Sequence, residues 1–223
     1  MYVFLSHVVD PADRGYPGEP TLEIEPTVRI ARGDVYNASI MHLFNHFGSH
    51  MDAPKHFNDN GPGIADIPMD RLIYEKVCVL DIPKGQAGQI VRSDLEPHAA
   101  ALAASDCALI RTGVEALRRT DPEAYAARGA SVGVNGAEYL IASFPNLKAI
   151  GLDVISLASP SHADEAARAH QTMLGKFSDN YICIIEDLAL SVLGDRTPRR
   201  VFSLPLRVKG LDGAPVTVVA EVE

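Results

Sequence analysis

A short segment of the chain carries four side chains that can bind a metal ion or transfer a proton. His46, His50, Asp52 and His56 all belong to His-Phe-Gly-Ser-His-Met-Asp-Ala-Pro-Lys-His at residues 46–56. Neutral imidazole nitrogens and carboxylate oxygens are suitable ligands for zinc, manganese or iron. Because the segment holds no thiolate, the pattern favours an open catalytic metal site over a closed structural zinc site.

The backbone around these side chains decides whether they can converge. His42, His46 and His50 recur at a helical spacing, which could stack them on one helix face. Gly48 and Pro54 would interrupt such a helix, so we expect a strand that leads into an irregular loop. In that loop Gly48 permits a sharp turn and Pro54 stiffens the chain, so that His46 and His50 can reach one metal ion.

Asp52 follows His50 at the same-side spacing of an extended chain, so both side chains can point to one place. An isolated histidine is more often structural or solvated than a ligand, and we interpret four others in that way: His7, His42, His98 and His162. For the clustered residues a metal site is the better interpretation than an ordinary surface loop.

Composition narrows the class of protein. The length of 223 residues fits one domain spanning 1–223, and 47% apolar residues are enough for a sizeable core. A net charge of −9 argues against binding to nucleic acid or to an anionic membrane surface. Acidity does not identify a substrate; it mainly favours solubility, and bound divalent cations would offset part of the charge.

The three cysteines lie in apolar runs and show no metal-binding or disulfide spacing. Cys78, Cys107 and Cys183 are expected to be buried free thiols, which suggests a reducing compartment. The amino-terminal residues lack the basic region of a signal peptide, and no apolar stretch is long enough to span a bilayer. The expected location is cytoplasmic.

The elements that must position the site are mostly strands. Short apolar or alternating runs predict strands at 2–9, 22–30, 38–45, 76–82, 107–112, 148–152, 181–186, 200–208 and 215–221. Helices are expected at 94–104, 122–128 and 135–143. Strict alternation of strands and helices is absent, as are the glycine-rich phosphate-binding motifs. The expected fold is α/β, with a mixed-sheet or barrel-like β core and helices packed outside.

Local signals mark the ends of several elements. Ser93 with Glu96 is expected to cap the helix at 94–104, Asp121 the helix at 122–128, and Asn135 the helix at 135–143. Near the carboxyl end, Asp212 and Gly213 form a pair typical of a hairpin turn.

Glu186 ends a strongly apolar predicted strand. A carboxylate buried there requires a partner, and a metal ion is a good one. The alternative is a carboxylate at a strand end that faces water.

The segment at 46–56 resembles the His-x-Gly-Thr-His-x-Asp-x-Pro-x-His signature of the cyclase family, which includes bacterial kynurenine formamidase (arylformamidase) and isatin hydrolase. Ser49 stands where threonine is usual, and both residues carry a hydroxyl group. Three weaker matches follow in the family's order: Arg111-Thr112-Gly113, Gly151-Leu152-Asp153 with Ser156, and Leu204-Pro205-Leu206. The resemblance implies the family's swivelling β/β/α fold.

The resemblance also implies a site for two divalent metal ions per subunit, zinc or manganese. His46, His50 and Asp52 would bind the first ion. Asp52 and Glu186 would bridge to the second, and His170 would complete it, while His56 would act in general acid/base catalysis. A local insertion at 176–180 lengthens the interval before Glu186, so His162 competes with His170.

By the same resemblance the protein is a metal-dependent hydrolase that cleaves the C–N bond of a small amide, formamide or cyclic amide. Tyr16 matches the place of a substrate-contacting tryptophan in the family's kynurenine formamidases. Two alternatives are a metal-dependent lyase or dehydratase acting on a small carboxylic acid and a non-catalytic metal-binding protein. Family members are commonly homo-oligomers, so a dimer or tetramer is expected, with contacts through the N-terminal loop and residues 157–180.

Overall fold

A nine-stranded mixed sheet forms the centre of the computed structural model, which describes residues 1–223. Its strands are β1 (Tyr2–Phe4), β4 (His50–Asp52), β5 (Ile73–Tyr74), β6 (Val77–Asp81), β8 (Cys107–Arg111), β10 (Ala149–Leu152), β11 (Cys183–Glu186), β12 (Arg200–Pro205) and β13 (Gly213–Glu221). The order across the sheet is β5-β12-β13-β4-β11-β10-β8-β6, with β1 paired to β13. Neighbours from β5 to β11 are antiparallel, and those from β11 to β6 are parallel.

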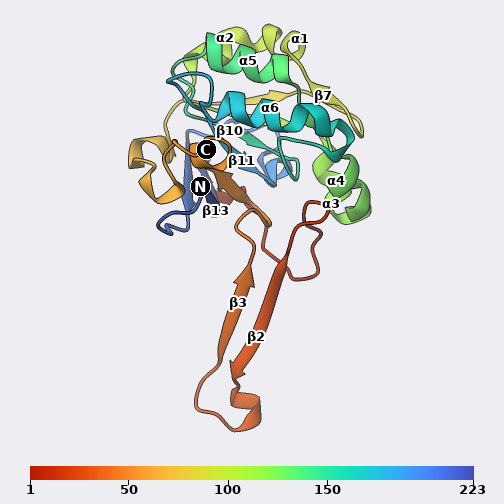
Figure 1. Cartoon of the computed structure of the whole chain (residues 1–223), viewed down its shortest axis with the longest axis vertical. Helices are drawn as coiled ribbons and strands as arrows, with labels where there is room; N and C mark the ends of the chain where they lie inside the picture. Colours follow the sequence, from red (N-terminus) through yellow and green to blue (C-terminus); the bar gives the residue numbers. More distant parts are fainter.

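The mixed sheet forms a nearly closed, barrel-like core. The helices pack outside it, with α1, α2, α5 and α6 together on one side (Figure 1). The helices are α1 (Arg92–Leu95), α2 (Ala99–Ala104), α3 (Leu117–Thr120), α4 (Pro122–Arg128), α5 (Val134–Ser143) and α6 (Ala163–Met173). This arrangement confirms the predicted α/β fold class with a barrel-like β core. None of these helices has the length and apolar character that crossing a lipid bilayer requires.

The parallel strands β8, β10 and β11 are mostly apolar because both of their faces are largely buried. In β8, Cys107 and Leu109 belong to one hydrophobic core, whereas Ala108 and Ile110 belong to a second core that includes helix residues. Because successive side chains of a strand point to opposite faces of the sheet, the two faces of β8 contribute to two separate hydrophobic cores. Cysteines 78, 107 and 183 are all buried and free, as the sequence predicted.

The predicted helices form with some changes at their ends. The helix at 122–128 is confirmed as α4, and the Asp121 carboxylate accepts the Ala124 N–H at 3.0 Å. The helix at 94–104 is interrupted: α1 and α2 are separated by a 3-10 turn that contains Pro97. Proline lacks an N–H donor and disfavours a continuous α-helix there.

Two predicted caps are wrong. At α1 the Asp94 carboxylate accepts the Val91 N–H at 2.8 Å, so Ser93 is not the cap. At α5 the helix begins after Gly133, and the Asn135 side chain accepts the Arg92 N–H instead. Helix α6 was not predicted from the sequence.

The strands predicted at 22–30 and 38–45 form outside the central sheet. They appear as β2 (Leu22–Val28) and β3 (Ala38–Leu43), an antiparallel hairpin that projects from the body as an arm (Figure 1). A second small sheet pairs β7 (Gln89–Ile90) with β9 (Ser131–Val132). The β3 strand leads directly toward the histidine segment.

Candidate metal centre

The histidine segment enters the middle of the central sheet rather than staying a loop. Residues 44–49 turn irregularly, as predicted, but His50–Asp52 form strand β4 between β13 and β11. The prediction of a loop beyond His50 is therefore wrong, because pairing with two distant strands orders this stretch. Gly48 has a φ of +71°, and a Cβ there would lie 3.1 Å from Val9 Cγ2. The positive φ favours glycine at this turn, and the close approach to the Val9 side chain adds to that preference.

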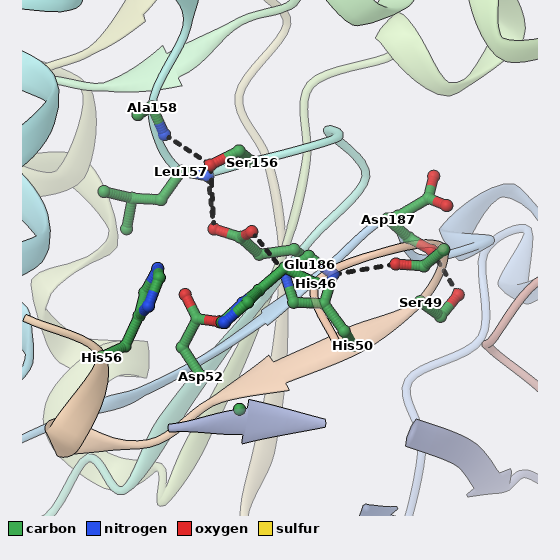
Figure 2. Close-up of polar contacts among 12 residues, drawn as sticks. His46, Ser49, His50, Asp52, His56, Ser156, Leu157, Ala158, Glu186 and Asp187 are labelled. Carbon is green, nitrogen blue, oxygen red and sulfur yellow. Dashed lines mark hydrogen bonds and ion pairs between the residues drawn. The ribbon is translucent and has the colours of Figure 1, made fainter. Parts of the chain in front are cut away.

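Four buried side chains converge at this point from three elements. We call them the inner cluster: His50 and Asp52 on β4, Glu186 at the end of β11, and His170 on α6. His50 Nε2 lies 3.0 Å from Glu186 Oε2 and 3.6 Å from Asp52 Oδ1. His170 Nε2 lies 3.6 Å from Glu186 Oε1 and 3.8 Å from Asp52 Oδ2. Figure 2 shows His50, Asp52 and Glu186 turned toward one another.

Backbone carbonyl groups fix the tautomers of both histidines in the inner cluster. His50 Nδ1 lies 2.8 Å from the Gly48 carbonyl oxygen, and His170 Nδ1 lies 3.0 Å from that of Ala166. Each Nδ1 must carry the proton that it donates to its carbonyl, so each neutral ring directs its Nε2 lone pair toward Asp52 and Glu186. Oriented imidazole lone pairs of this kind are typical of metal ligands.

The carboxylates also indicate that a cation belongs here. Asp52 and Glu186 are both buried, and Asp52 Oδ2 has no hydrogen-bond partner. Burial would raise the pKa of Glu186, but its contacts with His170 and His50 outweigh this and lower that pKa. Burial would lower the pKa of His50, yet the Glu186 carboxylate raises it. Two buried anions that draw protons onto their neighbours fit a divalent ion.

A second set of side chains lies beside the inner cluster and nearer the surface. We call it the outer group: His46, His56 and Asp212. Asp212 Oδ2 lies 2.7 Å from His56 Nδ1 and 3.1 Å from His46 Nε2. The other nitrogen of His46, Nδ1, lies 2.9 Å from Asp52 Oδ1. The two imidazole rings stack with their centroids 4.0 Å apart.

The outer group shifts the ionisation of its members. Hydrogen bonds from His46 and His56 lower the pKa of Asp212. Burial opposes protonation of His46, but the Asp212 and Asp52 carboxylates raise the pKa of His46 to about 10. His46 therefore connects the two sets, with one carboxylate on each side of its ring.

Asp212 is the residue that sequence reasoning missed. The pattern assigned Asp212 and Gly213 to a hairpin turn, but the turn lies earlier, at Gly210 with a φ of +88°. Gly213 instead begins β13 and pairs with Asp52 on β4. A Cβ at Gly213 would lie only 2.6 Å from His46 Cε1, so glycine makes room for the imidazole. The only local signal for Asp212 was the Asp-Gly pair itself, which here lies at the start of a strand and not in a turn.

A chain of polar contacts supports the turn that carries His50. The Ser49 hydroxyl donates to the Asp187 carbonyl oxygen and accepts the His7 N–H at 2.8 Å. The Asp187 carboxylate in turn accepts hydrogen bonds from Arg118 and Tyr125. Serine at position 49 therefore supplies the hydroxyl contact that anchors the loop to the residue after Glu186, as Figure 2 shows.

Two of the three weaker motifs, Arg111-Thr112-Gly113 and Gly151-Leu152-Asp153 with Ser156, meet at another point of the fold. The Asp153 carboxylate accepts the N–H groups of Thr112 and Gly113 and the Thr112 hydroxyl at 2.6 Å. It thus joins the ends of β8 and β10. Ser156 lies near Glu186, whose Oε1 accepts the Leu157 N–H.

The structure separates the two competing histidines. His170 lies in the inner cluster, whereas His162 Nε2 contacts the Ala87 carbonyl oxygen at 2.7 Å, away from it. His42 sits on the arm and pairs with Glu25 at 3.6 Å in solvent. The placement of these two agrees with their interpretation as structural or solvated residues.

A cavity of about 300 Å³ opens beside both sets. Its walls are partly apolar, with Phe44, Phe57, Ile155 and small residues of α6. Tyr16 lines it as well, at the place that sequence reasoning assigned to substrate contact. Phe57 stacks on the His170 ring with centroids 4.6 Å apart, so the cavity wall also supports a residue of the inner cluster.

A larger cleft of about 750 Å³ lies elsewhere and shares no residue with this cavity. Two of its three arginines are already paired: Arg111 with Asp81, and Arg118 with Asp187 and Asp13. The larger cleft therefore lacks the converging lone pairs found beside the smaller cavity.

Comparison with known proteins places these features in a family. The Cyclase family ("Putative cyclase") matches residues 3–159, which include the histidine segment. An uncharacterized protein of Haemophilus influenzae is 37% identical over 117 residues, which cover 52% of this chain and 82% of the relative.

Solved structures show the same fold at low identity. Isatin hydrolase A of Labrenzia aggregata, bound to benzyl benzoate, has a TM-score of 0.82 and 20% identity over 100% of this chain and 94% of its own. A predicted metal-dependent hydrolase from Bacillus stearothermophilus has a TM-score of 0.72 and 21% identity, covering 99% of this chain and 97% of its own. With the family match over 3–159, the chain belongs to the cyclase family.

Proposed function

We propose that this protein is a metal-dependent hydrolase that cleaves a C–N bond of a small molecule, in the manner of an arylformamidase. The observation that carries the proposal is the inner cluster, where two buried carboxylates face the Nε2 atoms of two histidines whose Nδ1 atoms donate to backbone carbonyl groups. A donor set of nitrogen and oxygen without sulfur suits zinc or manganese.

The residues divide naturally between two ions. His46 and His50 would hold the first ion and His170 the second, with Asp52 and Glu186 shared between the two. When bound, the ions would lower the pKa of a water molecule and polarise a substrate carbonyl group. Side chains of the protein itself would carry out the remaining steps.

His56 is the proposed proton-transfer residue. It lines the cavity, and its side chain is 25% exposed, so a substrate can reach it. Its Nδ1 is occupied by Asp212, which leaves Nε2 to accept a proton from water and to return it to the departing nitrogen. Overall, the carbonyl carbon loses its bond to nitrogen and gains one to oxygen. An imidazole can perform both halves of this transfer near neutral pH.

The cavity supports a small substrate with an apolar portion. Phe44, Phe57 and Tyr16 can contact a ring, while the reacting carbonyl group lies toward the inner cluster. The resemblance in fold to isatin hydrolase, named for a cyclic amide substrate, supports this class.

The test is a screen of the metal-reconstituted protein against formamides, lactams, cyclic imides and matched esters. We expect turnover of at least one C–N substrate with zinc or manganese and none after chelation. Hydrolysis in ¹⁸O water should place one labelled oxygen in the acyl product. Turnover without label would instead support a lyase or dehydratase. Metal binding without turnover of any substrate would support a non-catalytic metal-binding protein.

We also propose that the protein is a homo-oligomer and that its arm contributes to the interface. Ile24, Ile40 and Met41 on β2 and β3 are 46–57% exposed. A two-stranded hairpin is marginally stable alone in water, so packing against a second chain would stabilise the arm. Light scattering should show a dimer or tetramer, and Ile40→Asp should shift it toward monomer.

We also propose that residues 1–223 form one domain, that the protein is cytoplasmic, and that its partners are small molecules rather than nucleic acid or membranes. The acidic composition supports the choice of partners, and the buried free cysteines support a reducing compartment. Expression of the intact chain with a fluorescent fusion would test the location.

A further inference from the structure

The Asp212 carboxylate contacts two histidines that have different proposed tasks. We propose that Asp212 is a positioning residue that fixes the tautomers of His46 and His56, so that His46 presents Nδ1 to the metal and His56 presents Nε2 to the substrate. This inference rests on the proposed function and extends it to a residue outside the histidine segment.

The hydrogen-bond chemistry carries the first step. An ionised carboxylate only accepts hydrogen bonds, so the two ring nitrogens that face Asp212 Oδ2 must each carry a proton. These are His46 Nε2 and His56 Nδ1. No carboxylate faces His56 Nε2, so the neutral His56 ring carries its lone pair there. His46 Nδ1 faces the Asp52 carboxylate as well, so both of its nitrogens carry protons in the metal-free protein. A bound cation would displace the Nδ1 proton and leave the proton on Nε2, where Asp212 holds it.

The directions in which the two nitrogens, His46 Nδ1 and His56 Nε2, point agree with the two tasks. His46 Nδ1 lies 2.9 Å from Asp52 Oδ1, on the side of the inner cluster. A carboxylate behind the N–H of a metal-binding histidine is a common arrangement that orients the ring and strengthens the ligand. His56 keeps its free Nε2 on a ring that lines the cavity.

The carboxylate itself is held rigidly. Its Oδ1 accepts the Asn45 side-chain N–H at 2.8 Å, and the Asp212 main-chain carbonyl accepts the Ala53 N–H at 2.9 Å. The next residue, Gly213, is already paired with β4. Asp212 therefore comes from the ordered start of a strand, and its position is set relative to the same strand that carries the inner cluster.

Asp212 also has a clear role during proton transfer. When His56 Nε2 accepts a proton, the ring becomes an imidazolium cation, and the adjacent carboxylate stabilises that charge without taking the proton. The proton then passes to the departing nitrogen, and the neutral tautomer is restored.

The test compares Asp212→Asn with Asp59→Asn, a control at an exposed carboxylate whose partner is Lys55. The asparagine keeps the size of the side chain but can donate a hydrogen bond as well as accept one. In zinc-loaded, ¹⁵N-histidine-labelled protein, NMR should show His56 as the Nδ1–H tautomer in the wild type and control. In Asp212→Asn the Nε2–H tautomer should gain population.

Metal binding and kinetics provide two further readouts. Calorimetry should show unchanged metal stoichiometry in Asp212→Asn, with affinity lowered by about 10–100-fold. With an active substrate, kcat should fall by about 10–100-fold while KM stays within about threefold. The control should match the wild type in all three measurements. Asn45→Ala removes the hydrogen bonds to Asp212 Oδ1 and to the Gly213 carbonyl oxygen but leaves the contacts of Oδ2 with both histidines. It should shift the same quantities less and serves if Asp212→Asn does not fold.

Three results would overturn the inference. They are an unchanged His56 tautomer in the variant, loss of one equivalent of metal, which would make Asp212 a ligand, and a defect confined to KM. If the wild type hydrolyses nothing, the proposed function fails, but the tautomer and affinity measurements still decide the role of Asp212.

Discussion

The inner cluster and the outer group lie side by side, yet they differ in burial and in anchoring. The side chains of His50, Asp52 and Glu186 are 1–3% exposed, whereas those of His56 and Asp212 are 25% and 33% exposed. The inner histidines are fixed by backbone carbonyl groups, and the outer ones share a side-chain carboxylate.

This difference explains how one short segment can serve two tasks. Buried carboxylates have no water to solvate them, so the inner cluster strongly favours a bound cation. The outer group reaches the cavity, where a proton can be exchanged with a substrate. Residues close in sequence, such as His50 and His56, thus acquire separate roles because the sheet buries one and leaves the other at its edge.

The largest effect should come from the inner cluster. Glu186→Gln removes one of the two buried negative charges, so it should lose at least one equivalent of metal and reduce kcat/KM by about 10⁴-fold, equivalent to several kcal/mol of transition-state stabilisation. Metal analysis and kinetics on the same sample would measure this. Glu138→Gln, at an exposed site on α5, is the matched control. Full metal content in Glu186→Gln would contradict the role of this cluster.

The second-largest effect should distinguish the outer group from the inner cluster. His56→Gln should lower kcat by about 10²–10³-fold, within the range of general acid/base catalysis, while metal content stays unchanged. His42→Gln on the exposed arm is the control. Loss of metal from His56→Gln would show that the outer group binds an ion itself, and the proposed division would then be wrong.

Metal removal should affect stability in a pH-dependent way. A metal ion present at 1,000 times its Kd stabilises the folded state by about 4 kcal/mol, so chelation should lower Tm. In the metal-free protein the carboxylates raise the pKa of His46 to about 10, above its unfolded value of about 6.5. A raised histidine pKa stabilises the fold below pH 6.5, and this stability is lost as the pH rises toward 10.

Thermal unfolding of chelated protein between pH 6 and 10 would measure that loss. His46→Gln should flatten the dependence, and a metal-free Tm that rises over this range would contradict the assignment.

The smallest effect should come from the support of the turn. Ser49→Ala removes the hydroxyl group that links His7 and Asp187, and metal affinity should fall by about tenfold. Ser49→Thr keeps the hydroxyl group and should stay within about twofold. Calorimetric titration with zinc would distinguish the two variants, and equal affinities would show that the hydroxyl contact does not orient His50.

Sequence alone identified the chemistry of residues 46–56, because ligand types and the same-side spacing of His50 and Asp52 are local properties. It also predicted Glu186, since a carboxylate at the end of an apolar strand is expensive to bury without a partner. Helix α4 was also predictable from the local sequence, because Asp121 and Pro122 mark its start.

Only the tertiary structure decided which distant residues complete the site. The order β13-β4-β11 brings Asp212 and Glu186 to opposite sides of the histidine strand, and α6 delivers His170 rather than His162. Asp212 was misassigned because an Asp-Gly pair favours a turn locally, whereas pairing of Gly213 with Asp52 depends on strand register. Register and helix placement arise from packing between segments far apart in the chain, which local residue patterns do not encode.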